Sequence, residues 1–390
     1  AYISDSKSER NDGMEIYVVR PGDTLYNIAA KYALRAETLA ELNQLSDPSR
    51  LTAGMALYIP GFEDGQRPPI EVNGYAYPKI TAAALNAKLP YLTFLCPFSH
   101  SVTAEGELRP INDGRLVSAA YAASAAPLLT VTNLSESSGF SSDIAHAVFT
   151  DEQVQNRVFD NILSTLREKK YYGINFNIEY VYPFDREGYN AFIRRAAEVF
   201  HPLGYYLTSA IAPKDSDRQS GLLYEAHDYA AHGRYMDRVI IMTYEWGYTY
   251  GAPQAVSPVD RMRAVLEYAV TKIPAGKILM GFSNYGYNWR LPWRQGEAAQ
   301  VVSNAGAPDL AMSMGAEIHY DAVASAPYFN YTDAAGHPHT VWFEDVRSVR
   351  ARLGLAAEFG LAGISIWTID KLFRPGLEVL NSMYSVEKIV

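Results

Sequence analysis

From residue 71 to the end of the chain, short hydrophobic runs alternate with amphipathic stretches. The runs are rich in β-branched and aromatic residues, as buried parallel strands are, and most are followed by apolar residues at helical spacing. The predicted strands are Val72–Tyr77, Tyr91–Phe98, Pro127–Thr132, Tyr172–Glu179, Tyr205–Ala212, Arg238–Glu245, Lys277–Phe282 and Ala362–Thr368. The predicted helices between them include Asp151–Lys169, Arg186–His201, Pro258–Thr271 and Asp345–Phe359. Eight such units over about 320 residues predict an α/β fold, a single TIM (β/α)8 barrel over residues 71–390.

The seventh and eighth predicted strands lie unusually far apart in the sequence. Residues 289–343 fill the gap, and they contain a hairpin-like stretch, Tyr328–Thr332 and His339–Phe343, around Ala334-Ala335-Gly336. We therefore predict a small α+β subdomain inserted into the barrel. A doubly wound sheet is the alternative fold, which the number of strands disfavours.

Residues 15–60 predict a separate compact unit with the order βααβ. Pro21-Gly22-Asp23-Thr24 supplies a turn and a helix N-cap after the first strand, Glu15–Arg20. Apolar residues then follow at helical spacing in two short helices, and a second strand ends at Pro60. Gly61–Pro69 is rich in Gly, Pro and charge, so we interpret it as a linker to the barrel.

Composition and charge narrow the class of protein. The hydrophobic content of 48% allows a large core, and 34 basic against 43 acidic residues give a net charge of −9. Because basic runs are absent, nucleic acid and anionic lipid are not expected partners. No run of about 18 apolar residues predicts a membrane span, and Ala1–Gly13 lacks the apolar stretch of a signal peptide, which was either removed or never present. Cys96 is the single cysteine of the sequence and no Cys/His cluster has zinc spacing, so we expect no disulfide, metal or other cofactor.

The fourth predicted strand carries the candidate chemistry. Side chains alternate along a strand, so Gly173, Asn175, Asn177 and Glu179 share the face that points into the barrel. Buried polar groups are costly, and stability alone gives little reason to place them there. Glu179 comes last, at the carboxyl end where TIM-barrel active sites lie. A structural hydrogen-bond network at the barrel mouth is the alternative explanation.

This strand resembles the D-G-x-D-x-D-x-E signature of the family 18 glycoside hydrolases, with Glu179 at the position of the catalytic acid. Met242-Thr243-Tyr244-Glu245 resembles the family's M-x-Y-D motif, and Gly363-Ile364-Ser365-Ile366-Trp367 resembles its last barrel strand. Within the family, Asn73–Pro78, Gly221–Gly233 and Met242–Gly247 look like the spore cortex-lytic N-acetylglucosaminidases of spore-forming bacteria.

The resemblance implies substrate-assisted retention, in which the sugar's own N-acetyl oxygen attacks the anomeric carbon. Glu179 is then the acid and base, Tyr244 holds the acetamide, and Trp367 stacks beneath the ring. The predicted catalytic residues are Glu179, Asn177 and Tyr244. The predicted substrate-binding residues of the barrel are Trp367, Asn175, Glu245, Met242, Tyr75 and Tyr285. The substrate must then contain N-acetylglucosamine or a similar sugar.

The N-terminal unit resembles a LysM domain, a module that binds N-acetylglucosamine-containing glycans. The matching residues are Tyr17-Val18-Val19, Gly22-Asp23-Thr24-Leu25, Ile28-Ala29, Leu39, Asn43, Leu51, Gly54, Leu57 and Ile59-Pro60. The resemblance implies a glycan groove between Gly22–Tyr26 and Leu51–Met55, with Gly22, Asp23, Thr24 and Leu25 as binding residues. Deletion of residues 1–62 is expected to leave the barrel folded and to weaken binding to insoluble peptidoglycan.

The chain departs from the family signature at several positions. Asn175 and Asn177 stand where the family has aspartates, Tyr172 replaces the first aspartate, and Glu245 replaces an aspartate of the sixth strand. Asn177 matters most. At this position the family's aspartate carries a negative charge that offsets the positive charge of the oxazolinium intermediate. Loss of one such group costs roughly 3 kcal/mol of transition-state stabilisation.

Two main hypotheses follow for the function. The first is a hydrolase acting on peptidoglycan, most readily spore cortex or its fragments, and the second is a glycan-binding protein with an inactive barrel. A chitinase is a third interpretation, since the same chemistry serves. We expect a monomer located in the cell wall, at the spore surface or cortex of a bacterium, or outside the cell.

Overall fold

The computed structural model describes residues 14–61, 66–136 and 139–390. The N-terminal unit consists of β1 (Met14–Val18), α1 (Leu25–Lys31), α2 (Ala36–Leu42) and β2 (Ala56–Pro60), and β1 pairs with β2 antiparallel. The βααβ order predicted from the sequence is confirmed. Ala1–Gly13 and residues 62–65 of the predicted linker lie outside the described residues.

Within the described residues, eight parallel strands close into a barrel. These strands are β3 (Pro69–Ala76), β4 (Phe94–Pro97), β7 (Ala126–Thr132), β8 (Gly173–Asn177), β9 (Tyr206–Ile211), β10 (Arg238–Ile241), β11 (Ile278–Ser283) and β17 (Gly363–Trp367). Each pairs with the next in this order, and β17 pairs with β3 to close the ring. The predicted TIM barrel is confirmed, and each predicted strand overlaps an observed one.

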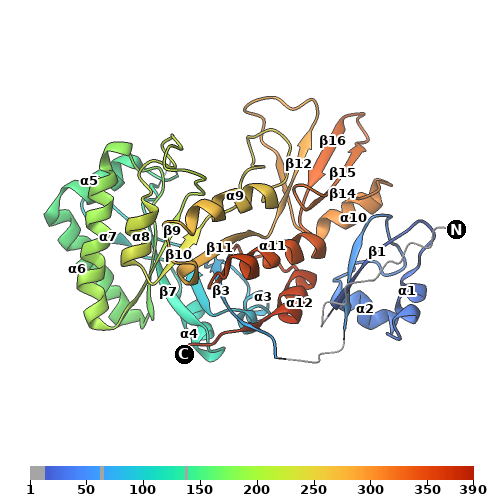
Figure 1. Ribbon diagram of the computed structural model, residues 1–390, viewed down its shortest axis with the longest axis horizontal. Helices are drawn as coiled ribbons and strands as arrows, with labels where there is room; N and C mark the ends of the chain where they lie inside the picture. Colours follow the sequence, from blue (N-terminus) through green and yellow to red (C-terminus); the bar gives the residue numbers. More distant parts are fainter. Residues whose placement is uncertain (1–13, 62–65, 137–138) are drawn as a thin grey trace.

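Helices surround the barrel (Figure 1). They are α3 (Ala82–Asn86), α4 (Gly114–Ala122), α5 (Ser142–Thr150), α6 (Glu152–Lys169), α7 (Arg186–Phe200), α8 (Tyr229–Tyr235), α9 (Val259–Ala269), α11 (Val346–Phe359) and α12 (Arg374–Met383). Local chemistry sets their ends: Asp151 caps α6 by accepting from two backbone N–H groups, and Lys170 closes the helix in the left-handed conformation. Short 3-10 turns and strands complete this part: η1 (Leu89–Tyr91), β5 (His100–Val102), β6 (Leu108–Arg109), η2 (Pro183–Asp185), η3 (His201–Leu203), η4 (Ala275–Lys277) and β18 (Ser385–Val386).

The predicted insertion lies between β11 and β17. It comprises β12 (Gly286–Arg290), β13 (Gln300–Val302), α10 (Gly306–Ser313), β14 (His319–Asp321), β15 (Ala326–Thr332) and β16 (Pro338–Trp342). The strands form an antiparallel sheet in the order β13-β12-β16-β15-β14, which stands beside the barrel in Figure 1. The predicted hairpin is β15 and β16, and Asp333 organises its turn by accepting from the backbone N–H groups of Ala335 and His337.

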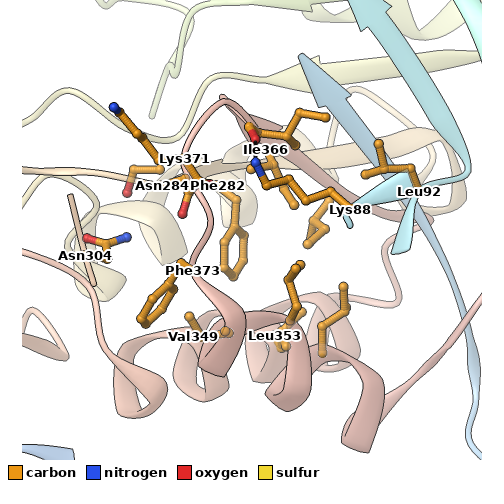
Figure 2. A pocket seen from close by; sticks show the side chains of 16 residues that line it. Lys88, Leu92, Phe282, Asn284, Asn304, Val349, Leu353, Ile366, Lys371 and Phe373 are labelled. Atoms are coloured by element: carbon orange, nitrogen blue, oxygen red, sulfur yellow. Dashed lines mark hydrogen bonds between the residues drawn. The ribbon is translucent and has the colours of Figure 1, made fainter. Parts of the chain in front are cut away.

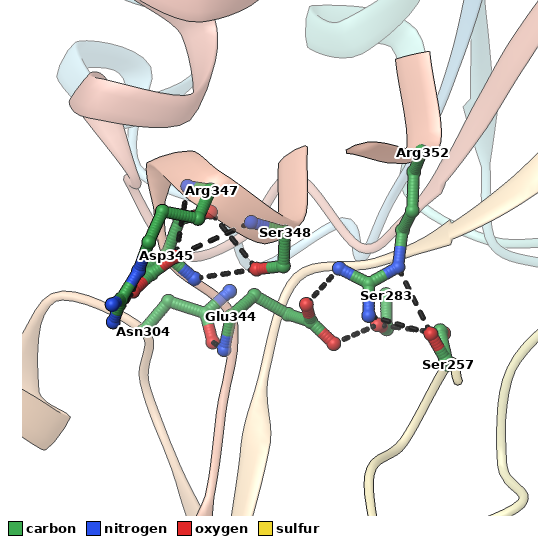
Figure 3. A network of polar contacts seen from close by, with 8 residues as sticks. All are labelled: Ser257, Ser283, Asn304, Glu344, Asp345, Arg347, Ser348 and Arg352. Carbon is green, nitrogen blue, oxygen red and sulfur yellow. Dashed lines mark hydrogen bonds and ion pairs between the residues drawn. The ribbon is translucent and has the colours of Figure 1, made fainter. Parts of the chain in front are cut away.

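A buried polar network joins the insertion to the barrel (Figure 3). Glu344 forms an ion pair with Arg352, and both side chains are almost fully buried. Ser283, at the end of β11, donates to Glu344 at 3.2 Å, and Arg352 donates to the Ser257 carbonyl at 2.6 Å. Burial raises the pKa of Glu344 to about 7, although the Arg352 charge acts to lower it. The network fixes the chain where it leaves the insertion and enters α11.

The LysM-like unit packs directly against the insertion and the last helix, as Figure 1 also shows. Its apolar core is continuous with that of the insertion: Leu57 and Met55 belong to the same buried cluster as Ile318, Phe329 and Phe343. Apolar surface removed from water at such a contact stabilises the docked arrangement. The two units therefore share a core as well as a covalent connection.

Polar contacts fix the orientation of this docking. The Ile318 N–H donates to the Ala53 carbonyl at 2.9 Å, extending the contact of residues 51–55 with the insertion. Gln44 bonds on both sides of its amide, accepting from Arg374 N at 2.9 Å and donating to the Leu372 carbonyl at 3.3 Å. One wall of the predicted LysM groove, residues 51–55, is thus also a contact surface for the insertion.

The packing predicts that substitution by alanine has different effects at two glycines of the LysM-like unit. Gly54 and Gly22 have similar backbone angles, φ +83 and +87, so alanine strains both about equally. A Cβ at Gly54 would lie 1.7 Å from the Ile318 carbonyl oxygen, whereas one at Gly22 meets open space. We expect Gly54→Ala to undock the unit and Gly22→Ala to leave it docked. Small-angle scattering would show a larger maximum dimension for Gly54→Ala alone. Equal scattering curves would contradict this interface.

Candidate active site

Strand β8 presents its polar residues to the barrel interior, as the alternation predicts. Asn175 accepts a hydrogen bond from the Tyr75 hydroxyl at 2.8 Å and donates to Thr208 Oγ1 at 2.8 Å. Ile174 and Phe176 point outward into the large core cluster beneath the helices. Gly173 is required here, because a Cβ would lie 2.1 Å from the Tyr206 carbonyl oxygen.

Glu179 lies just beyond the end of β8, and two residues that the sequence analysis missed hold it there. Asn133 accepts from the Glu179 N–H at 3.0 Å and donates to its carbonyl at 2.8 Å. His227 accepts from Ala212 N at 2.9 Å through Nδ1, so Nε2 carries the proton and donates to the Ile178 carbonyl at 3.0 Å. Burial lowers the pKa of His227 to about 4, which keeps this donor neutral.

The electrostatics of Glu179 are those of a proton donor near neutral pH. Burial raises the pKa of its carboxyl to about 8, with a hydrogen bond from Asn177 lowering it and the Glu245 charge raising it further. Asn177 is buried and uses its amide nitrogen for Glu179, while its Oδ1 atom has no partner within the described residues. The site thus holds a carboxyl poised to donate beside a free carbonyl acceptor.

Tyr244 and Met242 follow β10, which ends at Ile241, earlier than the predicted Glu245. Met242 is buried among the barrel-interior residues, in the same cluster as Tyr75. Burial and the Glu179 charge raise the pKa of Tyr244 well above its usual value, so the phenol keeps its proton as a donor. Gly281 of β11 makes room for the ring, since a Cβ there would lie 2.8 Å from Tyr244 Cε1.

Glu245 lies beyond the end of β10 and adopts the left-handed backbone conformation, with φ 67. Its carboxylate accepts hydrogen bonds from the hydroxyls of Tyr285 and Tyr287, the latter at 3.1 Å. Desolvation raises the pKa of Glu245, although both phenols act to lower it. Tyr285 was a predicted binding residue, whereas Tyr287 was missed. The insertion therefore contributes to the site through its first strand, β12.

Trp367, at the end of β17, is surrounded by aromatic rings. Its ring centroid lies 4.7 Å from that of Phe98, 5.3 Å from that of Tyr75 and 6.1 Å from that of Tyr77. Edge-to-face contacts of this kind fix the ring in place before any ligand binds. Phe98 and Tyr77 extend the predicted set. Trp367, Tyr75, Glu179, Tyr244, Glu245 and Tyr285 are thus brought together around one barrel mouth.

The predicted LysM residues lie apart from the barrel site. Asp23 accepts from Tyr17 OH and Arg20 N, each at 2.8 Å, and Thr24 caps α1 by accepting from Asn27 N. Leu25 is buried, while Gly22 faces open space. These residues form a fixed loop, and the neighbouring Tyr26 side chain is 74% exposed.

A cavity of about 50 Å³ lies elsewhere, between the outer face of β11 and β17 and the helices α11 and α12 (Figure 2). Its lining is mostly aliphatic and aromatic, with Lys88, Asn284 and Asn304 among the polar members, and it contains no carboxyl group. This cavity therefore lacks the carboxyl groups that Glu179 and Glu245 supply at the barrel mouth.

Two features are absent from the part of the chain that the structure describes. No group of three or more His, Cys, Asp or Glu side chains there is arranged to hold a metal ion. No helix there combines the length and apolarity that a membrane crossing requires.

Comparison with known proteins gives matches for both units. The profile of Glycosyl hydrolases family 18 matches residues 128–371, and that of the LysM domain matches residues 17–60. The chain is 40% identical to the cortical fragment-lytic enzyme of Bacillus subtilis (strain 168), over 96% of this chain and 99% of that protein.

Solved structures agree with the sequence matches. The spore cortex-lytic enzyme SleL of Bacillus megaterium QM B1551 superposes with a TM-score of 0.91 at 31% identity, covering 97% of this chain and 99% of that one. A chitinase from Chromobacterium violaceum ATCC 12472 superposes with a TM-score of 0.74 at 26% identity, covering 81% of this chain and 99% of that one. The chain therefore belongs to glycosyl hydrolases family 18, as a glycosidase that carries an N-terminal LysM domain.

Proposed function

We propose that this glycosidase cleaves N-acetylglucosamine linkages in spore-cortex peptidoglycan or its fragments by substrate-assisted retention. The observation that carries the proposal is the pairing of Glu179 with Asn177. Burial raises the pKa of the Glu179 carboxyl to about 8, and Asn177 offers a buried oxygen without a partner among the described residues. That oxygen suits the N–H of a substrate acetamide.

The proposed reaction uses groups already in place. The acetamide oxygen attacks the anomeric carbon as the glycosidic C–O bond breaks, and Glu179 gives its proton to the leaving oxygen. Tyr244 donates to the acetamide oxygen, and Asn177 accepts from the acetamide N–H. Water then attacks the oxazolinium ion while the Glu179 carboxylate takes the water's proton. Two displacements at one carbon retain its configuration.

Asn177 supplies a dipole where the family signature has a charge. In this proposal its carbonyl orients the acetamide, and Glu179 becomes an anion as the oxazolinium forms, so that anion offsets the positive charge. Glu245, held by Tyr285 and Tyr287, adds a second carboxyl within electrostatic range of Glu179. Trp367 supplies the flat ring on which the reacting sugar stacks.

The proposed substrate rests on the similar proteins. The Bacillus subtilis relative is named a cortical fragment-lytic enzyme, and the Bacillus megaterium structure is of a spore cortex-lytic enzyme. We infer the same substrate class here, with the protein acting as a monomer in the spore cortex or cell wall. The LysM loop that carries Gly22, Asp23 and Thr24 binds the same glycan, while the predicted binding residue Leu25 is buried and supports that loop from the core. The likeness to a chitinase makes chitin the second candidate substrate.

Product analysis tests the proposal. The protein is incubated with cortex fragments and with chitin oligomers, and new reducing ends are sought by mass spectrometry. The proposal expects cortex products that end in N-acetylglucosamine. Products from chitin alone would make the protein a chitinase, and no products from either substrate would leave the glycan-binding interpretation.

The pH dependence of kcat/KM follows from the acid role of Glu179. The acid must be protonated to donate, so we expect kcat/KM to fall as pH rises through about 8. Asn177→Asp places a second carboxyl beside Glu179, and two carboxyls so close share one proton. The alkaline limb should therefore move to higher pH in Asn177→Asp. A pH–rate profile on a soluble fragment measures the alkaline limb of the unmodified protein and of Asn177→Asp. Superimposable profiles would contradict the coupling between the two carboxyls.

A further inference from the structure

The cavity between the barrel and the helices α11 and α12 is separate from the candidate active site (Figure 2). Phe282, Ile364 and Ile366 line it, and they belong to the core cluster outside the barrel. Trp367 and Met242 of the candidate site belong to the cluster inside the barrel. The strands β11 and β17 therefore stand between this cavity and the barrel interior.

Lys88 brings an ammonium group to this mostly apolar cavity. The residue is only 3% exposed, and its Nζ atom donates to the Ile369 carbonyl. Among the residues that the structure describes, no carboxylate forms an ion pair with Lys88, and the Asp370 charge acts on it from a greater distance. Burial lowers the pKa of Lys88 to about 8, with the Lys371 charge also acting to lower it. A buried charge without an opposite charge in contact is costly, and an ammonium has three N–H donors, so Lys88 can bond to a further acceptor.

Asn304 supplies a second unused donor on the wall of the same cavity. The residue is 2% exposed, and its Oδ1 atom accepts from the Glu344 N–H at 2.9 Å. Its Nδ2 atom is buried and has no hydrogen-bond partner among the described residues. The amide nitrogen of Asn284, in contrast, already donates to the carbonyls of Thr368 and Lys371. The cavity thus has unused donors at two side chains, and no carboxyl group lines it.

The size and the lining of the cavity narrow the kind of ligand that fits. Its volume of about 50 Å³ exceeds the ~30 Å³ that one water molecule occupies, and it is well below the ~150 Å³ of a cavity that holds benzene. A sugar or aromatic ring is therefore too large. Walls such as Phe282 and Leu353 favour a ligand with an apolar part over a bare inorganic ion. Lys371, which also lines the cavity, is exposed and places a second positive charge on the side toward solvent.

We propose that this cavity is a binding site for a short-chain carboxylate, such as acetate or propionate. The carboxylate pairs with the Lys88 ammonium and accepts a hydrogen bond from the Asn304 amide, while the alkyl group packs against Phe282 and Leu353. The ligand supplies the opposite charge that no described residue places in contact with Lys88. A ligand that binds only the folded chain also stabilises it, increasingly as its concentration exceeds the dissociation constant.

Thermal unfolding and calorimetry test this site with sodium propionate against sodium chloride at equal ionic strength. We expect the unfolding midpoint to rise with the concentration of propionate and not with that of chloride. Lys88→Met keeps an unbranched apolar side chain but removes the ammonium, and it should raise the Kd of propionate by about tenfold or more. Lys170→Met is the matched control, because Lys170 is exposed at the end of α6, and its Kd should equal that of the unmodified protein.

Two further measurements keep the test decisive if Lys88→Met does not fold. Asn304→Leu leaves the ammonium in place and should weaken propionate binding by a smaller factor. Crystals of the unmodified protein grown with propionate should show the carboxylate beside the Lys88 Nζ atom. Equal protection by chloride and propionate would overturn the proposal. An unchanged Kd in a folded Lys88→Met variant, or a cavity that holds only water at saturating propionate, would overturn it as well.

Discussion

Glu179→Gln is expected to lower kcat/KM on cortex fragments by about 10³-fold or more, because the amide cannot donate the proton that the leaving oxygen needs. The substitution preserves the shape of the side chain. The backbone contacts of Asn133 with residue 179 remain, so the fold and the affinity for glycan should be retained. Initial rates from released reducing ends, with a binding isotherm for the same fragment, give both quantities.

Glu168→Gln is the matched control for this substitution. Glu168 is exposed in the last turn of α6, at the amino end of the barrel strands and away from the candidate site. Its replacement should leave kcat/KM unchanged. Turnover by Glu179→Gln close to that of the unmodified protein would remove Glu179 from the acid role and with it the proposed mechanism.

Arg352→Met is expected to destabilise the protein by about 3–5 kcal/mol, because it leaves the buried Glu344 carboxylate without its charge partner. Both side chains are almost fully buried, and Arg352 also donates to the Ser257 carbonyl. Without Arg352, the pKa of Glu344 rises further above that of the unfolded chain. At low pH Glu344 is protonated and its burial without a partner costs little, whereas at high pH a buried carboxylate remains. The decrease in the free energy of unfolding caused by Arg352→Met should therefore be smaller at about pH 5 than at about pH 8.

Urea denaturation measures this effect against two comparisons. Arg263→Met removes an arginine from an exposed pair with Glu358, and solvent screening should leave the free energy of unfolding nearly unchanged. Arg352→Met combined with Glu344→Leu removes both buried charges and should recover most of the loss. A double variant as unstable as Arg352→Met would show that packing, and not the stranded charge, causes the effect.

The barrel could be predicted from the sequence because its strands are buried on both sides. β7 and β11 are buried along their whole length, so continuous apolar runs mark them. The polar exceptions in β8 were equally visible, since Asn175 and Asn177 interrupt such a run at alternate positions. Hydrophobic periodicity thus located both the scaffold and the strand that carries the candidate site.

The residues that were missed depend on contacts between distant segments. Asn133 follows β7, and the register pairs Thr132 with Asn177, so aligning the ends of neighbouring strands could have placed Asn133 beside Ile178. His227 supports the same segment from a loop with no periodic pattern. The left-handed turn at Glu245 leaves no local signal either, because a glutamate rarely adopts that conformation.

The docking of the LysM domain could not be predicted from local sequence patterns either. The bond between Ile318 and Ala53 joins segments that lie in different predicted units. Ala307 and Ala311 of α10 have the spacing of a helix with one apolar face. The sequence does not show what covers that face, and in the structure it packs against the apolar cluster of the LysM domain. The Gly61–Pro69 composition indicated a linker, and such a composition carries no information on whether the joined units touch.

The anomeric configuration of the first product tests the central claim most directly. Proton NMR follows hydrolysis of a soluble N-acetylglucosamine-containing cortex fragment from its first minutes, before the anomers equilibrate. Substrate-assisted catalysis by Glu179 predicts that the first reducing sugar has the configuration of the bond that was cleaved. A first product of opposite configuration would contradict the mechanism, and so would undiminished cleavage of a fragment whose N-acetyl groups have been removed.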